Sequence, residues 1–113
     1  MAQPAYENTY DPNGVVLSEW RVDGERVLVE GTYTKGSVLG AAVGGNYELT
    51  ATAAEAESIL LADITVPTGE TRKAPVVEGG EVAEDALVLG GTLTIADVKD
   101  VLRDKNIYIK KRG

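Results

Sequence analysis

Carboxylates are the most abundant side chains in this sequence that could carry acid–base chemistry. The 113 residues include 18 aspartates and glutamates but no histidine and no cysteine. Close pairs of acids include Glu78 with Glu81, Glu84 with Asp85, and Asp97 with Asp100. A glycosidase needs two acids that face each other across a cleft, and an EF-hand needs acids at fixed loop positions. The pairs match neither pattern, so we interpret them as solvated surface residues, with a calcium site around residues 78–85 as the alternative.

The remaining residue types exclude most other catalytic classes. Without histidine there is no Ser-His-Asp triad, and without cysteine there is no thiol nucleophile or thiolate metal ligand. The three serines lie outside the nucleophile-elbow motif, and the glycines form no phosphate-binding loop or dinucleotide fingerprint. We therefore expect no enzyme, no catalytic residues, no cofactor and no metal.

Lys73 provides the one alternative in which the chain carries a cofactor. Glu70-Thr71-Arg72-Lys73-Ala74 resembles the turn of lipoyl-carrier domains in which a lysine bears the swinging group. Gly36 to Leu39 also resembles a segment of those domains. The family holds these two segments close together, whereas here Lys73 follows Leu39 by 34 residues and Arg72 replaces an acid. A lipoyl-type carrier domain with Lys73 modified is therefore the alternative function.

The elements that must position any site are mostly short strands. Residues 15–33 predict two strands joined by a hairpin turn at Asp23-Gly24, because alternating apolar residues flank that dipeptide. The near-continuous apolar run Ile59 to Val66 predicts one strand buried on both faces. Glycines, prolines and asparagines delimit further short strands, which we place within residues 35–40, 46–49, 74–77 and 86–89. Residues 50–58 are predicted to form a loop.

Turn residues mark where these strands end. Gly44-Gly45 and Pro67 to Glu70 are predicted turns, and Gly79-Gly80 is expected to interrupt the strand that begins at Ala74. Pro75 lacks a backbone N–H, so it requires an edge or a bulge.

One helix is predicted near the end of the chain. Thr94 is its N-cap, with Asp97 three residues on in a capping-box arrangement. Val98, Val101 and Leu102 have the spacing of one buried helical face, and Asn106 is a C-cap candidate. Ile107 to Ile109 then predicts a terminal strand. The fold class is therefore mostly β with one C-terminal helix (α+β), in a single domain over residues 15–113.

Residues 1–14 differ from this domain. They contain two prolines and show no helical or strand periodicity, so we predict a flexible arm. Its large apolar groups are Tyr6 and Tyr10, which supply contact area at low entropic cost. Such an arm is either an ordinary frayed terminus or a segment that folds on a partner.

Composition narrows the choice of partner. The net charge of −7 argues against nucleic acid and anionic membranes, because both select basic surfaces. The longest apolar stretch, Val38 to Val43, is far shorter than the roughly 20 residues of a membrane-spanning helix. The sequence begins without a secretory leader, so we expect synthesis in the cytoplasm. A core without phenylalanine is light, which favours self-association.

Six segments in chain order resemble the lambda-type head decoration proteins of tailed bacteriophages. They cover the chain from about Val15 to Ile109, and their order is more specific than any one of them. The segments are Thr34 to Gly40, Asn46 to Leu49, Ile59 to Ile64, Pro75 to Val82, Ala86 to Gly91, and Thr94 to Arg103 with Ile107 to Ile109. The chain departs from the family at Val82, where an aromatic residue is usual, and at Asn106, where glycine is usual. Its arm is short and matches nothing closely, and the Phe-Pro pair often found at the start of the domain is absent.

The resemblance implies a compact β-barrel (tulip) domain with a flexible N-terminal arm, assembled as a homotrimer. Family members cement the expanded head against the pressure of packaged DNA. They bind its outer surface at three-fold and quasi-three-fold positions, and their arms add a strand to the major capsid protein. The expected location is therefore the virion. The expected capsid-binding residues are Ala5, Tyr6, Glu7, Asn8, Tyr10 and Pro12.

Overall fold

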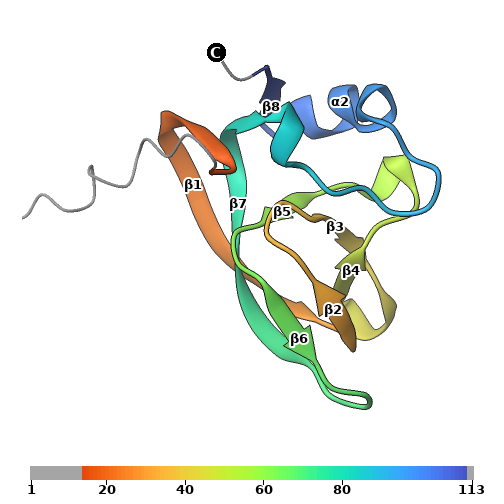
Figure 1. Ribbon diagram of the computed structural model, residues 1–113. Coiled ribbons are helices and arrows are strands. Elements are labelled where there is room, and N and C mark those ends of the chain that lie inside the picture. The colour runs from red at the N-terminus through yellow and green to blue at the C-terminus, as the bar shows by residue number, and fades with distance from the viewer. Residues whose placement is uncertain (1–13, 112–113) are drawn as a thin grey trace, which may run out of the picture.

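Two long antiparallel strands, β1 (Val16–Leu28) and β7 (Arg72–Ala83), form a ribbon along one side of the domain (Figure 1). The computed structural model describes residues 14–111, without the side chains of Glu19 and Val43. The predicted hairpin at Asp23-Gly24 is wrong, because Gly24 pairs with Val76 inside the ribbon. A Cβ atom on Gly24 would overlap the Glu78 carboxylate, so this glycine provides space and not a turn.

The predicted break at Gly79-Gly80 is also wrong. Both glycines lie inside β7, opposite Val22 and Arg21 of β1. Gly80 has a positive φ of 136°, and the register shifts on either side of these pairs. A bulge therefore absorbs the irregularity while the strand continues. Pro75 pairs with Glu25 of β1, and its carbonyl accepts the Leu61 backbone N–H at 3.0 Å just beyond the end of β5, so its missing N–H falls where the β5–β7 pairing stops.

In the described part of the chain, five strands form a closed circuit of hydrogen-bonded neighbours. The circuit runs from β1 to β4 (Tyr47–Leu49), β3 (Val38–Ala41), β5 (Ser58–Leu60), β7 and back to β1. Its β1–β4 closure is a single parallel pair, Leu28 with Tyr47. β8 (Ile107–Lys110) adds to the C-terminal half of β7 in parallel. The domain is thus mostly β, as predicted.

The run Ile59 to Val66 is two strands and not the single strand predicted. β5 ends at Leu60, and β6 (Ile64–Val66) pairs with β2 (Gly31–Tyr33) in a separate two-stranded sheet. The chain changes direction around Asp63, whose Oδ1 accepts a hydrogen bond from the Lys35 backbone N–H at 2.7 Å. The expectation of burial on both faces is confirmed for β5, where all three residues are buried.

Two hydrophobic clusters lie on opposite faces of the central strands. Side chains alternate along a strand, so neighbouring residues of β3, β5 and β7 enter different clusters. Val38, Ile59 and Val77 pack with Val98 and Leu102 of the helix. Their neighbours pack with the β2–β6 sheet and with Leu28; they are Leu39, Leu60 and Val76.

The helix α2 (Ile95–Arg103) confirms the C-terminal prediction, and its bounds agree with the expected N-cap. Asp97 Oδ2 accepts the Thr94 backbone N–H at 2.8 Å, whereas the C-cap is Asp104 and not the expected Asn106, which takes a left-handed φ of 69° two residues later. The predicted strand at residues 86–89 is wrong. A 3-10 turn, η3 (Glu84–Ala86), occupies its start, and Val88 makes only an isolated bridge to Ser37.

Two further 3-10 turns occur in predicted irregular regions, η1 (Val43–Gly45) and η2 (Ala53–Glu55). None of the helices in residues 14–111 has the length and apolar character required to cross a membrane.

We predict that Gly36→Ala destabilises the fold far more than Gly69→Ala. Both glycines have positive φ, 97° and 81°, which costs a side-chain-bearing residue about 1–2 kcal/mol. A Cβ on Gly36 would also overlap the backbone carbonyl of Ala86, whereas a Cβ on Gly69 meets nothing within 4 Å. Urea unfolding should show a loss above about 3 kcal/mol for Gly36→Ala and about 1 kcal/mol for Gly69→Ala. Equal losses would contradict the packing of residue 36 against η3.

Candidate functional site

The predicted capsid-binding residues lie outside the described residues, which begin at Gly14. They are Ala5, Tyr6, Glu7, Asn8, Tyr10 and Pro12. The structure does define where their segment joins the domain. Gly14 and Val15 are buried, and the Val15 carbonyl accepts the Ala83 backbone N–H at 2.8 Å. Because Ala83 also pairs with Lys110 of β8, the N-terminal segment joins the domain where β7 and β8 end.

An exposed apolar surface lies close to this junction. Trp20 and Val22 of β1 are 49% and 53% exposed, the highest values among the large apolar residues described. The Trp20 ring meets Tyr108 of β8 edge-on, with centroids 6.1 Å apart and planes at 65°. The Val22 side chain lies over Gly79 of β7, the strand between β1 and β8. We call Trp20, Val22 and Tyr108 the aromatic face.

A bulge in β1 presents Trp20 on this face. Val16 pairs with Val82 but Arg21 pairs with Gly80, so β1 has extra residues between the two pairs. The Ser18 hydroxyl bridges the irregularity, since it donates to the Trp20 carbonyl at 2.6 Å and accepts the Glu81 N–H at 2.9 Å. Bulges commonly re-aim side chains at functional sites.

A small groove with basic walls adjoins the aromatic face between α2 and β8. Its volume is about 210 Å³, and it is lined by Lys99, Arg103, Tyr108, Ile109 and Lys110. Arg103 pairs with Asp100 at 3.0 Å on the surface, while Lys99 and Lys110 form no ion pair with any described residue. This surface is therefore locally basic in a chain whose net charge is −7. We call it the basic groove.

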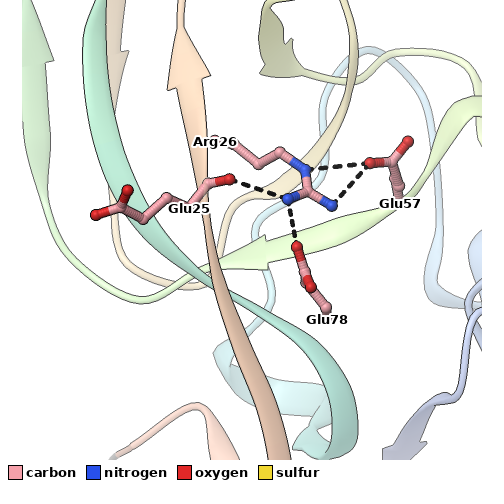
Figure 2. A network of polar contacts seen from close by, with 4 residues as sticks. All are labelled: Glu25, Arg26, Glu57 and Glu78. Atoms are coloured by element: carbon pink, nitrogen blue, oxygen red, sulfur yellow. Dashed lines mark hydrogen bonds and ion pairs between the residues drawn. The ribbon is translucent and has the colours of Figure 1, made fainter.

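A cluster of charges around Arg26 joins β1 to β7 and to the segment that precedes β5 (Figure 2). Arg26 lies on the same face of β1 as the buried Leu28. Its Nη1 donates to Glu78 of β7 and to the Glu25 carbonyl, and its Nε and Nη2 reach Glu57 Oε1 at 3.2 and 3.1 Å. The guanidinium also lies 5.2 Å from the ring centroid of Tyr47 in β4. We interpret the cluster as a structural clamp because every guanidinium nitrogen has a partner within the fold.

The pKa values in this region follow from burial and nearby acids. Burial lowers the pKa of Arg26, but the hydrogen bonds and charges of Glu78 and Glu57 outweigh it and raise the pKa above its usual value. Burial, and then Glu57, raise the pKa of Tyr47. Burial, with smaller effects of Glu48 and Glu30, raises the pKa of Tyr33. Both shifts move the loss of the phenol proton further above neutral pH, where tyrosine is already uncharged.

The paired acids of the sequence do not come together in a catalytic or metal-binding arrangement. Glu78 binds Arg26, Asp97 caps α2, and Asp100 pairs with Arg103. An open cavity of about 730 Å³ has four acids in its wall: Glu30, Glu48, Glu55 and Glu70. Within residues 14–111, no group of three or more acids is arranged to hold a metal ion.

Lys73 does not occupy the position of a carrier lysine. It lies inside β7 opposite Val27, three residues beyond the turn closed by the Glu70 N–H and the Pro67 carbonyl at 3.0 Å. A swinging cofactor requires the tip of such a turn, so the geometry gives the carrier alternative no support.

Sequence reasoning missed the aromatic face. Trp20 and Val22 fall within the first of the two strands predicted for residues 15–33, whose apolar residues are expected to be buried. The face requires Tyr108, which lies almost ninety residues away in the sequence and reaches β1 only through the parallel β7–β8 pairing. The available signal was Gly79-Gly80, since consecutive glycines in a strand often mark a bulge or a close approach.

We predict that Ser18→Ala lowers stability by about 1–3 kcal/mol, because the Glu81 N–H and the Trp20 carbonyl lose a buried partner. Ser58→Ala is the matched control. Its hydroxyl is buried and has no hydrogen-bond partner among the described residues, so its removal should be neutral or stabilising. Urea unfolding monitored by Trp20 fluorescence measures both. A larger loss for Ser58→Ala would contradict the assigned role of Ser18.

We predict that Arg26→Met destabilises the protein by roughly 1–3 kcal/mol, because Glu57 and Glu78 then lie half-buried without a cation. The triple variant Arg26→Met, Glu57→Gln, Glu78→Gln removes the unpaired charges and should recover much of the loss. Thermal unfolding of both variants tests this. If the triple variant is the less stable of the two, the cluster does not act through its charges.

The comparisons with known proteins add no constraint to this geometry. No family model matches the chain, and a search of curated proteins finds no significant match. The functional argument therefore rests on the residues themselves. The feature it must explain is the gathering of the aromatic face, the basic groove and the junction of the N-terminal segment at one end of the domain.

Proposed function

We propose that the protein is a head decoration protein of a tailed phage. It binds as a homotrimer to the outer surface of the expanded capsid, at three-fold and quasi-three-fold positions, and secures neighbouring capsomers against the pressure of packaged DNA. The observation that carries the proposal is the position of the N-terminal segment. It joins the domain beside the exposed Trp20 and the partly buried Tyr108, so the attachment point of this segment and a preformed apolar surface lie at one end of the domain.

The composition of the surface agrees with a binding role. Exposed aromatic residues are enriched in protein interfaces. Of the acids paired in the sequence, Asp97 caps a helix and Glu78 and Asp100 form ion pairs, while four other acids line an open cavity. The resemblance to the decoration family, from about Val15 to Ile109, supplies the identity of the partner as the major capsid protein.

Binding through the N-terminal segment requires that the gain from new contacts exceed the free-energy cost of ordering the segment. Fixing an unstructured residue in a strand costs about 1–2 kcal/mol, which cross-strand hydrogen bonds and side-chain contacts must offset. Three segments on one trimer raise the effective concentration of each, so weak individual contacts give firm attachment. A trimer that binds only the expanded lattice stabilises that lattice by mass action.

We predict that deletion of residues 1–13 abolishes binding to expanded heads and leaves a folded trimer. The deletion keeps the buried Gly14 and Val15, so the contact with Ala83 remains. Co-sedimentation with expanded heads measures binding, while light scattering and circular dichroism monitor assembly and folding. A full-length chain with residues 2–13 in scrambled order is the matched control for length and composition, and it should also fail to bind. Binding by the deleted chain would overturn the role of the segment.

A further inference from the structure

The aromatic face and the basic groove form one continuous surface with the properties of a binding site. Tyr108 belongs to both, since it contacts Trp20 and lines the groove with Lys99, Arg103 and Lys110. The surface is built on strands and a helix, and Ser18 fixes the bulge beneath Trp20. Contact between an exposed apolar patch and water is unfavourable, so covering the patch with a partner lowers the free energy.

From this surface we infer a second contact with the shell, distinct from the N-terminal segment, that binds an acidic and apolar segment of the capsid protein. The inference rests on the proposed function and adds the chemistry of the partner. Apolar side chains of that segment would cover Trp20 and Val22. One or two of its carboxylates would enter the groove near Lys99, Arg103 and Lys110.

The charges select an acidic protein over the other occupants. Two copies of this chain meeting through the same surface would bring their lysines together, and like charges disfavour that contact. A nucleic acid would be attracted to the lysines, but its dense negative charge would be repelled by the net charge of −7. A protein segment with one or two carboxylates carries much less charge to be repelled, and those carboxylates meet the two lysines that have no ion-pair partner among the described residues.

The size of the groove limits what enters it. A volume of about 210 Å³ accommodates a side chain or two and is too small for a helix. Lys99 and Arg103 are four residues apart on α2, and Tyr108 and Lys110 are two apart on β8, so each pair projects from one side of its element. A carboxylate between them would meet cations from both elements.

Val22 gives the sharpest test, because the sign of a charge placed there can be reversed at one exposed position. Val22→Glu and Val22→Lys make equally polar changes at a residue that is 53% exposed, so their effects on folding should match. We expect Val22→Glu to weaken binding to expanded heads at least roughly tenfold more than Val22→Lys, since the partner is acidic. Equal losses would overturn the assigned charge of the partner.

Two further variants test the roles of Trp20 and of the two lysines in the same co-sedimentation assay with expanded heads. Trp20→Ala and the double variant Lys99→Ala, Lys110→Ala should each bind at least roughly tenfold more weakly. The double variant should also show a shallower dependence of affinity on salt. Lys35→Ala with Lys73→Ala removes the same charge from exposed lysines elsewhere and should bind as the wild type does.

The outcomes separate this inference from the proposed function. Wild-type protein that fails to bind the heads overturns both. Wild-type binding that is unchanged in the Trp20 and lysine variants overturns the second contact alone. Loss of the trimer in Trp20→Ala, measured by light scattering, would assign the face to contacts between copies. Binding of labelled oligothymidine that Trp20→Ala abolishes would assign it to nucleic acid. Either result overturns the acidic-protein assignment.

Discussion

The fold depends on the burial of β3, β5 and β7 on both faces. Successive apolar residues in these strands enter different clusters, so each face must be covered by other parts of the chain. Helix α2, β8 and the start of β1 cover one face, and the β2–β6 sheet and the end of β1 cover the other. A chain of 113 residues thereby builds two small cores without any phenylalanine. Most of the large apolar residues described are buried in these cores, and Trp20 and Val22 are among the few that are exposed.

Two glycines inside the β1–β7 ribbon provide space for neighbouring side chains and do not form turns. Gly24 and Gly79 lie within long strands, and in both places a neighbouring side chain lies close to where a Cβ would be. The Glu78 carboxylate occupies that space at Gly24 and reaches Arg26, while Val22 packs tightly over Gly79, 3.3 Å from the Cβ position. Glycines in the β1–β7 ribbon thus leave room for both the Arg26 cluster and the aromatic face.

Local signals in the sequence predicted the elements that local interactions determine. The capped helix at Thr94, the Pro67–Glu70 turn and the terminal strand each depend on neighbouring residues, and each is confirmed. The errors arose at Asp23-Gly24, Ile59 to Val66, Gly79-Gly80 and Ala86 to Leu89, where distant partners decide the conformation. Asp23-Gly24 is extended because β7 lies alongside, and the 59–66 run divides because its halves pair with β3 and β2. The aromatic face could not be predicted for the same reason, since it unites residues from opposite ends of the chain.

The long β1–β7 ribbon has a mechanical consequence for a protein held by its N-terminal segment. Tension transmitted through Val15 enters β1 at the end where Val16 pairs with Val82. When that tension is directed along β1, it acts in shear, so the cross-strand hydrogen bonds from Val82 down to Arg72 share the load and must yield together. A strand peeled sideways would lose them one by one. The register of the ribbon therefore favours resistance to sustained pulling over easy unzipping.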